Sequence, residues 1–122
     1  MDNRPLSPHI TIQKKFLTAV FSIFHRLTGL GLSIGSIFIT FWIALIAFGQ
    51  DYYYLFNIFS TTLIFKFILL LWTVAIFYHL FNGIRYLFWS LSLGMDLNTV
   101  YISGYVVILL TILSSGIVWI FI

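Results

Sequence analysis

The chain has 122 residues, of which 61% are hydrophobic and 20% aromatic, whereas only 7% are charged. Soluble domains are typically about 25% charged and about 45–50% apolar, so this composition predicts a membrane protein. A chain of this length has room for about three or four spans of roughly 20 residues, and for no soluble catalytic domain beside them. Because it contains no cysteine, disulfides and cysteine-ligated zinc or iron–sulfur clusters are excluded within it.

The charged residues are unevenly distributed. Six Lys and Arg against three Asp and Glu give a formal net charge of +3, and four of the basic residues precede most of the first long apolar run, namely Arg4, Lys14, Lys15 and Arg26. By the positive-inside tendency, this bias predicts an N-terminus on the inner side of the membrane. The lipid bilayer is therefore the expected partner, and nothing in the charge pattern predicts nucleic-acid binding.

Residues 1–19 are expected to form an N-terminal segment on the inner face. Pro5 and Pro8 favour an extended path, which leaves open whether the segment docks against a partner or is a free interfacial tail. It has neither a signal-peptide apolar region nor an amphipathic presequence, so no cleaved targeting peptide is predicted.

The long apolar runs predict three transmembrane helices, at about residues 20–48, 62–89 and 101–122. The stretch QDYYY after Gly49 is expected to turn the chain on the outer side, and SLSLGMDLNT is expected to loop it back on the inner side. The predicted fold class is an all-α membrane protein with three transmembrane helices, its N-terminus inside and its C-terminus outside. The whole chain, residues 1–122, is expected to be one membrane-anchor domain.

Small and polar residues share one face of the first predicted span. They recur at alternating spacings of four and three, which places them along one side of a helix. This polar stripe consists of Ser22, Arg26, Gly29, Ser33, Ser36 and Thr40. Such residues let a neighbouring helix or a flat ligand approach the backbone closely. Helix packing alone explains Ser33, Ser36 and Thr40, whereas an intramembrane charge such as Arg26 needs compensation.

The second predicted span contains a histidine and an arginine in the very apolar stretch FYHLFNGIRYLFWS, residues 77–90. His79 shares a helix face with other polar or small residues three or four positions apart, so we expect it to point into the bundle. Two interpretations follow. His79 either donates a hydrogen bond to a neighbouring helix, or it is an axial ligand to haem iron, with Gly83 leaving room for the macrocycle and Arg26 and Arg85 neutralising its propionates. Arg85 is close enough to the predicted inner interface to snorkel towards it.

Three motifs together resemble a known family. RPLSPHITI at the start, SIFHRLTG at residues 22–29 and HLFNGIRYLFW at residues 79–89 are similar to the cytochrome b subunit, the larger membrane anchor, of succinate dehydrogenase (succinate:quinone oxidoreductase, respiratory complex II). The resemblance spans nearly the whole chain in order. It implies a three-helix anchor that pairs with a second small anchor subunit and carries an iron–sulfur subunit and a flavoprotein subunit on its inner face.

The resemblance also implies roles for individual residues. His79 would be the axial ligand to haem b, with the opposite ligand supplied by the second anchor. Ser22 and Arg26 would line the ubiquinone-reduction site, and His25 and Arg26 would lie near a haem propionate. The chain would be a non-catalytic subunit that helps electrons pass from the iron–sulfur subunit to quinone, with FAD and the iron–sulfur clusters held only by partner subunits.

The chain departs from the usual family pattern at Tyr86, where a histidine is usual, at Ser90, where an aspartate is usual, and in IQKKF, which replaces a more usual Tyr-Lys-Pro. The richness in Phe, Ile and Tyr suits an AT-rich genome, and the expected lack of a presequence suits either a bacterium or an organelle-encoded gene. A mitochondrial inner membrane is the expected location, with a bacterial inner membrane as the alternative. Two other functions stay open: a non-redox bundle protein such as a channel or assembly subunit, and the anchor of a quinol:fumarate reductase.

Overall fold

The computed structural model describes residues 17–121, apart from the side chain of Leu55. The motif RPLSPHITI and nearly all of the expected inner-face segment lie outside these residues. The described chain forms four helices: α1 (Leu17–Phe48), α2 (Gln50–Ser60), α3 (Leu63–Ser90) and α4 (Leu97–Phe121). No strand occurs between residues 17 and 121.

Three of these helices, α1, α3 and α4, are long and apolar enough to cross a membrane. The shortest of them, α4, has 25 residues and is therefore about 38 Å long, which exceeds the roughly 30 Å of a bilayer core. The predicted all-α fold with three transmembrane helices is thus confirmed. The inner position of the N-terminus and the outer position of the C-terminus stay predictions.

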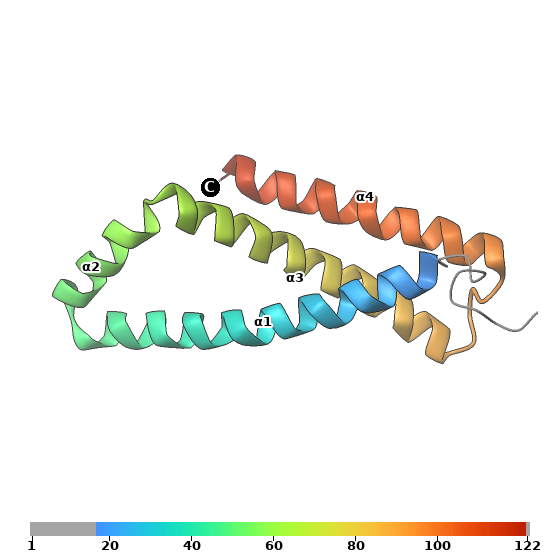
Figure 1. Ribbon diagram of the computed structural model, residues 1–122, viewed down its shortest axis with the longest axis horizontal. Coiled ribbons are helices and arrows are strands. Elements are labelled where there is room, and N and C mark those ends of the chain that lie inside the picture. Colours follow the sequence, from blue (N-terminus) through green and yellow to red (C-terminus); the bar gives the residue numbers. More distant parts are fainter. Residues whose placement is uncertain (1–16, 122) are drawn as a thin grey trace, which may run out of the picture.

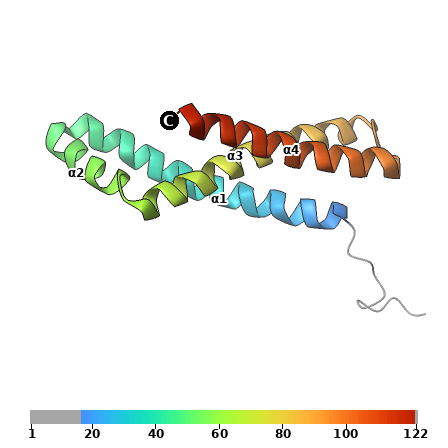
Figure 2. The same ribbon diagram turned by 90° about the horizontal axis from the view of Figure 1, so that it is seen from above.

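The stretch expected to turn the chain after α1 is instead a helix. Gly49 has a φ of 125°, in the region that favours glycine, and it separates α1 from the 11-residue helix α2. The residues after it include no glycine or proline to stop a helix, so the chain reverses through α2 rather than through a simple turn. Figures 1 and 2 show α2 at one end of the molecule and the α3–α4 connection at the other.

The connection between α3 and α4 is short and ends in a helix cap. Asp96 precedes α4 and accepts hydrogen bonds from the backbone nitrogen of Thr99 at 2.9 Å and from its hydroxyl at 2.8 Å. These two bonds hold the pKa of the Asp96 carboxyl below its usual range, and the bond from the Thr99 backbone has the larger effect. The cap explains why α4 begins at Leu97, four residues before the expected start of the third span.

Helix α3 packs against both α1 and α4 (Figure 1), and small residues bring the helices together. A Cβ added at Gly35 of α1 would collide with the indole nitrogen of Trp72 of α3. A Cβ added at Gly104 of α4 would lie 3.1 Å from the ring of Phe21 of α1. Most large apolar side chains face outward, as expected where lipid is the solvent and close packing rather than apolar burial joins the helices.

Replacing Gly35 tests this packing. We expect Gly35→Ala to lower the thermal stability of the assembled complex, because the Trp72 indole or the two helices must shift to admit the methyl group; overpacking of this kind typically costs about 1–3 kcal/mol. Gly31→Ala is the matched control, since nothing lies within 4 Å of a Cβ at Gly31. Thermal melts of the two variants should differ, and equal midpoints would contradict the proposed contact between Gly35 and Trp72.

Candidate functional site

His79 of α3 is held against α1 by its Nδ1 atom. This atom lies 3.2 Å from the backbone carbonyl oxygen of His25 and 3.2 Å from the hydroxyl oxygen of Thr28. A carbonyl oxygen can only accept a hydrogen bond, and the Thr28 hydroxyl already donates to the carbonyls of Phe24 and His25. We therefore assign the proton to Nδ1, which then donates to the His25 carbonyl. The Nε2 atom then keeps its lone pair, and it makes no hydrogen bond to any residue between 17 and 121.

The imidazole of His79 lies where α1 has no side chain. A Cβ added at Gly29 would come within 3.0 Å of Cε1 of His79, tighter than almost all real contacts. Gly83, one turn after His79, is beside a different ring, because a Cβ there would lie 3.6 Å from Cε1 of His25. Gly29 is therefore the residue that lets the His79 ring approach the backbone of α1.

His25 stacks on His79, which sequence reasoning did not foresee. The two ring centroids are 4.0 Å apart with an interplanar angle of 7°, and Tyr86 lies edge-on to His25 at 5.0 Å. The Nδ1 atom of His25 is buried and has no hydrogen-bond partner within the described residues. His25 precedes Gly29 by four positions, and this shared helix face was the signal that could have placed it opposite His79.

Ser22 and Arg26 lie one turn apart on α1, in the same two turns as His25. Ser22 is half-buried and Arg26 is exposed. Neither side chain donates a hydrogen bond within residues 17–121. The hydroxyls further along the polar stripe differ in this respect. Those of Ser33, Ser36 and Thr40 all donate to backbone carbonyls of α1, and the bond from Ser33 goes to Gly29 at 3.0 Å.

Arg85 does not snorkel to the interface as expected. It is only 5% exposed, because its guanidinium turns inward to where α3 meets α4. Nε donates to the Ser103 hydroxyl at 2.9 Å, and Nη2 donates to the Val100 carbonyl at 2.7 Å. Nη1 donates to Oδ1 of Asn82 at 3.3 Å. All three acceptors belong to α3 or α4, so these bonds hold the guanidinium among buried protein groups rather than at the interface.

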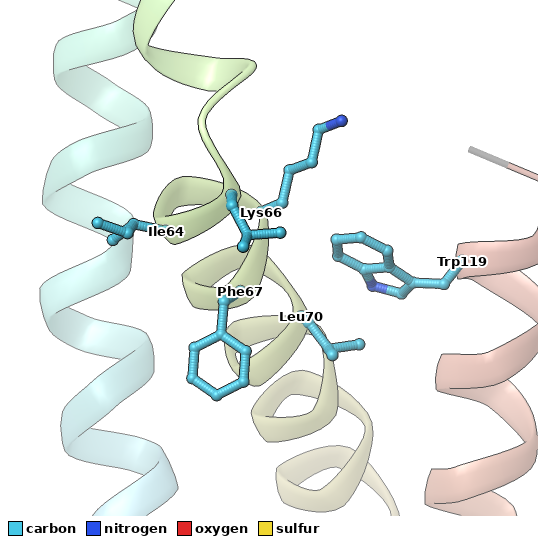
Figure 3. A pocket seen from close by; sticks show the side chains of 6 residues that line it. Ile64, Lys66, Phe67, Leu70 and Trp119 are labelled. Carbon is cyan, nitrogen blue, oxygen red and sulfur yellow. The ribbon is translucent and has the colours of Figure 1, made fainter.

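A separate groove lies between the start of α3 and the end of α4, with Trp119 reaching across from α4 (Figure 3). Its volume is about 530 Å³, and it is lined by Leu63, Ile64, Lys66, Phe67, Leu70 and Trp119. None of the expected site residues lines it, and Lys66 at its rim is its one charged residue. The groove offers no set of converging polar groups that would orient a quinone, so the candidate site stays on α1 and α3 around His79.

Residues 1–118 match the family model described as the succinate dehydrogenase/fumarate reductase transmembrane subunit. The chain belongs to this family. The resemblance read from the three sequence motifs is thereby confirmed. Since the family is one of transmembrane subunits and the structure contains three apolar helices of spanning length, the chain is a multi-pass inner-membrane subunit and not the catalytic subunit of its complex.

Named relatives agree with this assignment. The chain is 37% identical over 119 residues to the succinate dehydrogenase cytochrome b556 subunit of Rickettsia bellii, covering 98% of this chain and 93% of the relative. It is 36% identical to the cytochrome b560 subunit of Reclinomonas americana, covering 97% of this chain and 85% of that one. The mitochondrial cytochrome b560 subunit of Mus musculus is 41% identical over 93% of this chain and 69% of its own length. Similar subunits thus occur in bacteria and in mitochondria.

Proposed function

We propose that this family member is the haem b membrane anchor of a succinate:quinone oxidoreductase. In this proposal His79 supplies one axial ligand to haem b, and Ser22 and Arg26 form part of the ubiquinone-reduction site. The observation that carries the proposal is the hydrogen bond from His79 Nδ1 to the His25 carbonyl, which leaves the lone pair of Nε2 for a metal. Metal-binding histidines almost always donate their other ring N–H to such an acceptor.

The residues around His79 fit a haem. The absence of a side chain at Gly29 keeps the ring of His79 close to α1, and the half-buried His79 has Nε2 without a partner in the described chain. His25 and Arg26 would hold a propionate, since the buried Nδ1 of His25 has no partner among residues 17–121 and Arg26 is exposed. Arg85 was also expected near a propionate, but it already donates three hydrogen bonds and is therefore less well suited to hold one. When bound, haem b supplies a one-electron redox centre, and the second anchor subunit supplies its other ligand.

Ser22 and Arg26 suit the binding of a quinone carbonyl. A hydroxyl and a guanidinium one helical turn apart can both donate to the same region. Such donors stabilise the negative charge that develops on a carbonyl oxygen as it is reduced. Arg26 is the stronger donor of the two, because its guanidinium brings a full positive charge as well as hydrogen bonds.

The remaining chemistry belongs to partner subunits. A chain without cysteine cannot ligate an iron–sulfur cluster through thiolates, so an iron–sulfur subunit would deliver the electrons and a flavoprotein subunit would oxidise succinate. Residues 1–122 would act as one anchor domain with an inner N-terminus, as the four early basic residues favour. The family description also names fumarate reductase, and quinol oxidation in the reverse direction would use the same residues.

Replacing His79 tests the ligand assignment. We expect His79→Ala to abolish or strongly diminish the b-type absorption band, because the iron loses one axial ligand while the apolar spans still insert. His25→Ala removes the ring stacked on His79 and a proposed propionate contact but no iron ligand, so it should keep the band. The reduced-minus-oxidised spectrum of each purified complex measures this, and an unaltered band in His79→Ala would refute the assignment.

Replacing Ser22 and Arg26 tests the quinone site. We expect the ratio of quinone reductase to soluble-dye reductase activity to fall about five-fold in Ser22→Ala and about 10- to 100-fold in Arg26→Leu, because the second change also removes a charge. Dye reduction should survive, since succinate is oxidised in another subunit. Ser33→Ala is the matched control, because that hydroxyl is bonded to its own helix. If both activities fall together, these residues support assembly and the quinone role is wrong.

A further inference from the structure

Phe21, the residue before Ser22, fixes α1 to both other spanning helices. Its backbone carbonyl accepts hydrogen bonds from the Tyr78 hydroxyl at 3.0 Å and from Nδ2 of Asn82 at 3.5 Å. Phe21 is only 4% exposed, and its ring packs on Gly104 of α4. The Phe21 clamp therefore consists of Phe21 with Tyr78 and Asn82 on α3 and Gly104 on α4.

Arg85, on α3, contacts this clamp while it is also hydrogen-bonded to α4. Its Nη1 donates to Oδ1 of Asn82, the same amide whose nitrogen donates to the Phe21 carbonyl. Its guanidinium carbon also lies 5.1 Å from the centre of the Phe21 ring and 4.2 Å from that of Trp89, within the range of cation–π attraction. Arg85 thus contacts the clamp through one hydrogen bond, to Asn82, and through its charge over the Phe21 ring.

No carboxylate in the described chain pairs with the positive charge of Arg85. The acidic residues between 17 and 121 are Asp51 and Asp96, both exposed, and neither forms an ion pair with Arg85 among the contacts of the described residues. Neutral oxygens and aromatic faces hold the cation instead. Removing one partner of a buried, hydrogen-bonded charge is costly, so these acceptors tie Arg85 to its present position.

We propose that Arg85 is a positioning residue for the quinone site and not a propionate ligand. The Phe21 carbonyl and the Ser22 nitrogen belong to one planar peptide unit, so a carbonyl held by Asn82 also fixes the Cα of Ser22. Arg85 orients Asn82 and thereby sets where the Ser22 hydroxyl meets the quinone. This inference rests on the proposed role of Ser22.

Replacing Arg85 in the assembled complex tests the inference. Arg85→Gln should raise the KM for ubiquinone about five-fold, the effect of a misplaced hydrogen bond, while dye reductase activity, haem content and haem midpoint potential stay unchanged. Lys66→Gln removes the same charge at the other end of α3 and should leave all four quantities unchanged. A propionate ligand would behave differently, because losing a cation beside a propionate lowers the haem potential. A lowered potential with an unchanged KM would therefore overturn the proposal.

A milder variant covers the case in which Arg85→Gln does not assemble. Ser103→Ala removes the acceptor of Arg85 Nε and keeps the charge, so it should raise the quinone KM in the same direction by a smaller factor. An unchanged KM in Ser103→Ala, with Arg85→Gln unassembled, would leave Arg85 as a structural residue and overturn the positioning role.

A double variant separates this inference from the proposed function. If Arg85 acts through Ser22, then Ser22→Ala combined with Arg85→Gln should be no worse than Ser22→Ala alone, whereas effects that multiply would show independent action. A quinone activity that Ser22→Ala leaves unchanged would refute the role of Ser22 and the inference with it. A raised KM in Ser22→Ala but not in Arg85→Gln would refute the positioning role alone.

Discussion

The hydrogen bond from His79 Nδ1 to the backbone carbonyl of His25 determines the tautomer, the orientation and the position of the histidine together. It requires the proton on Nδ1, holds the ring against Gly29, and joins α3 to α1 at one level of the bundle. The stacking of His25 on the same ring follows from this contact. A histidine held in this way has a preorganised Nε2, which is what a protein must provide if a metal is to bind one particular side chain.

The rest of the bundle is arranged as a membrane requires. Apolar side chains face outward, and the buried positions include polar residues such as Asn82, Arg85 and Thr111. In lipid, burial of apolar surface does not drive helices together, so close approach at small residues and hydrogen bonds between helices do this work. The contacts of Gly35 with Trp72 and of Gly104 with Phe21 are examples. The hydrogen bonds that join α3 to α1, from His79 and from Asn82, also lie at the candidate site.

Sequence reasoning found the parts of this structure that depend on periodicity and charge. Long uncharged runs predicted the three spans, and the chemistry of His79 in an apolar helix identified it as a candidate ligand. It missed the helical form of α2, because tyrosines and a charge after Gly49 resemble a turn at the membrane surface. It also expected Arg85 at the interface, although the side chain is buried against Val100 and Ser103. Helical spacing gives the face of a residue, but the relative height and rotation of two helices decide which residues meet.

The relation between the Phe21 clamp and His79 would let one small chain serve the two proposed ligands. His79 and Asn82 lie three residues apart on α3, and both contact the backbone of α1, at His25 and at Phe21 respectively. The two hydrogen bonds span one turn of α1 and enclose Ser22 between them. Because both hydrogen bonds join α3 to the same turn of α1, they hold the candidate haem ligand on α3 in register with the candidate quinone residues on α1, and the helix pair acts as one frame.

We propose above all that this frame holds a haem b between this chain and a second anchor subunit. The most direct measurement is the reduced-minus-oxidised absorption spectrum of the wild-type complex purified through a tag on this chain, together with the identities of the proteins that copurify. We expect a b-type band with a second membrane subunit, an iron–sulfur protein and a flavoprotein present. A complex that contains the flavoprotein and the iron–sulfur protein but no reducible b-type band would contradict it.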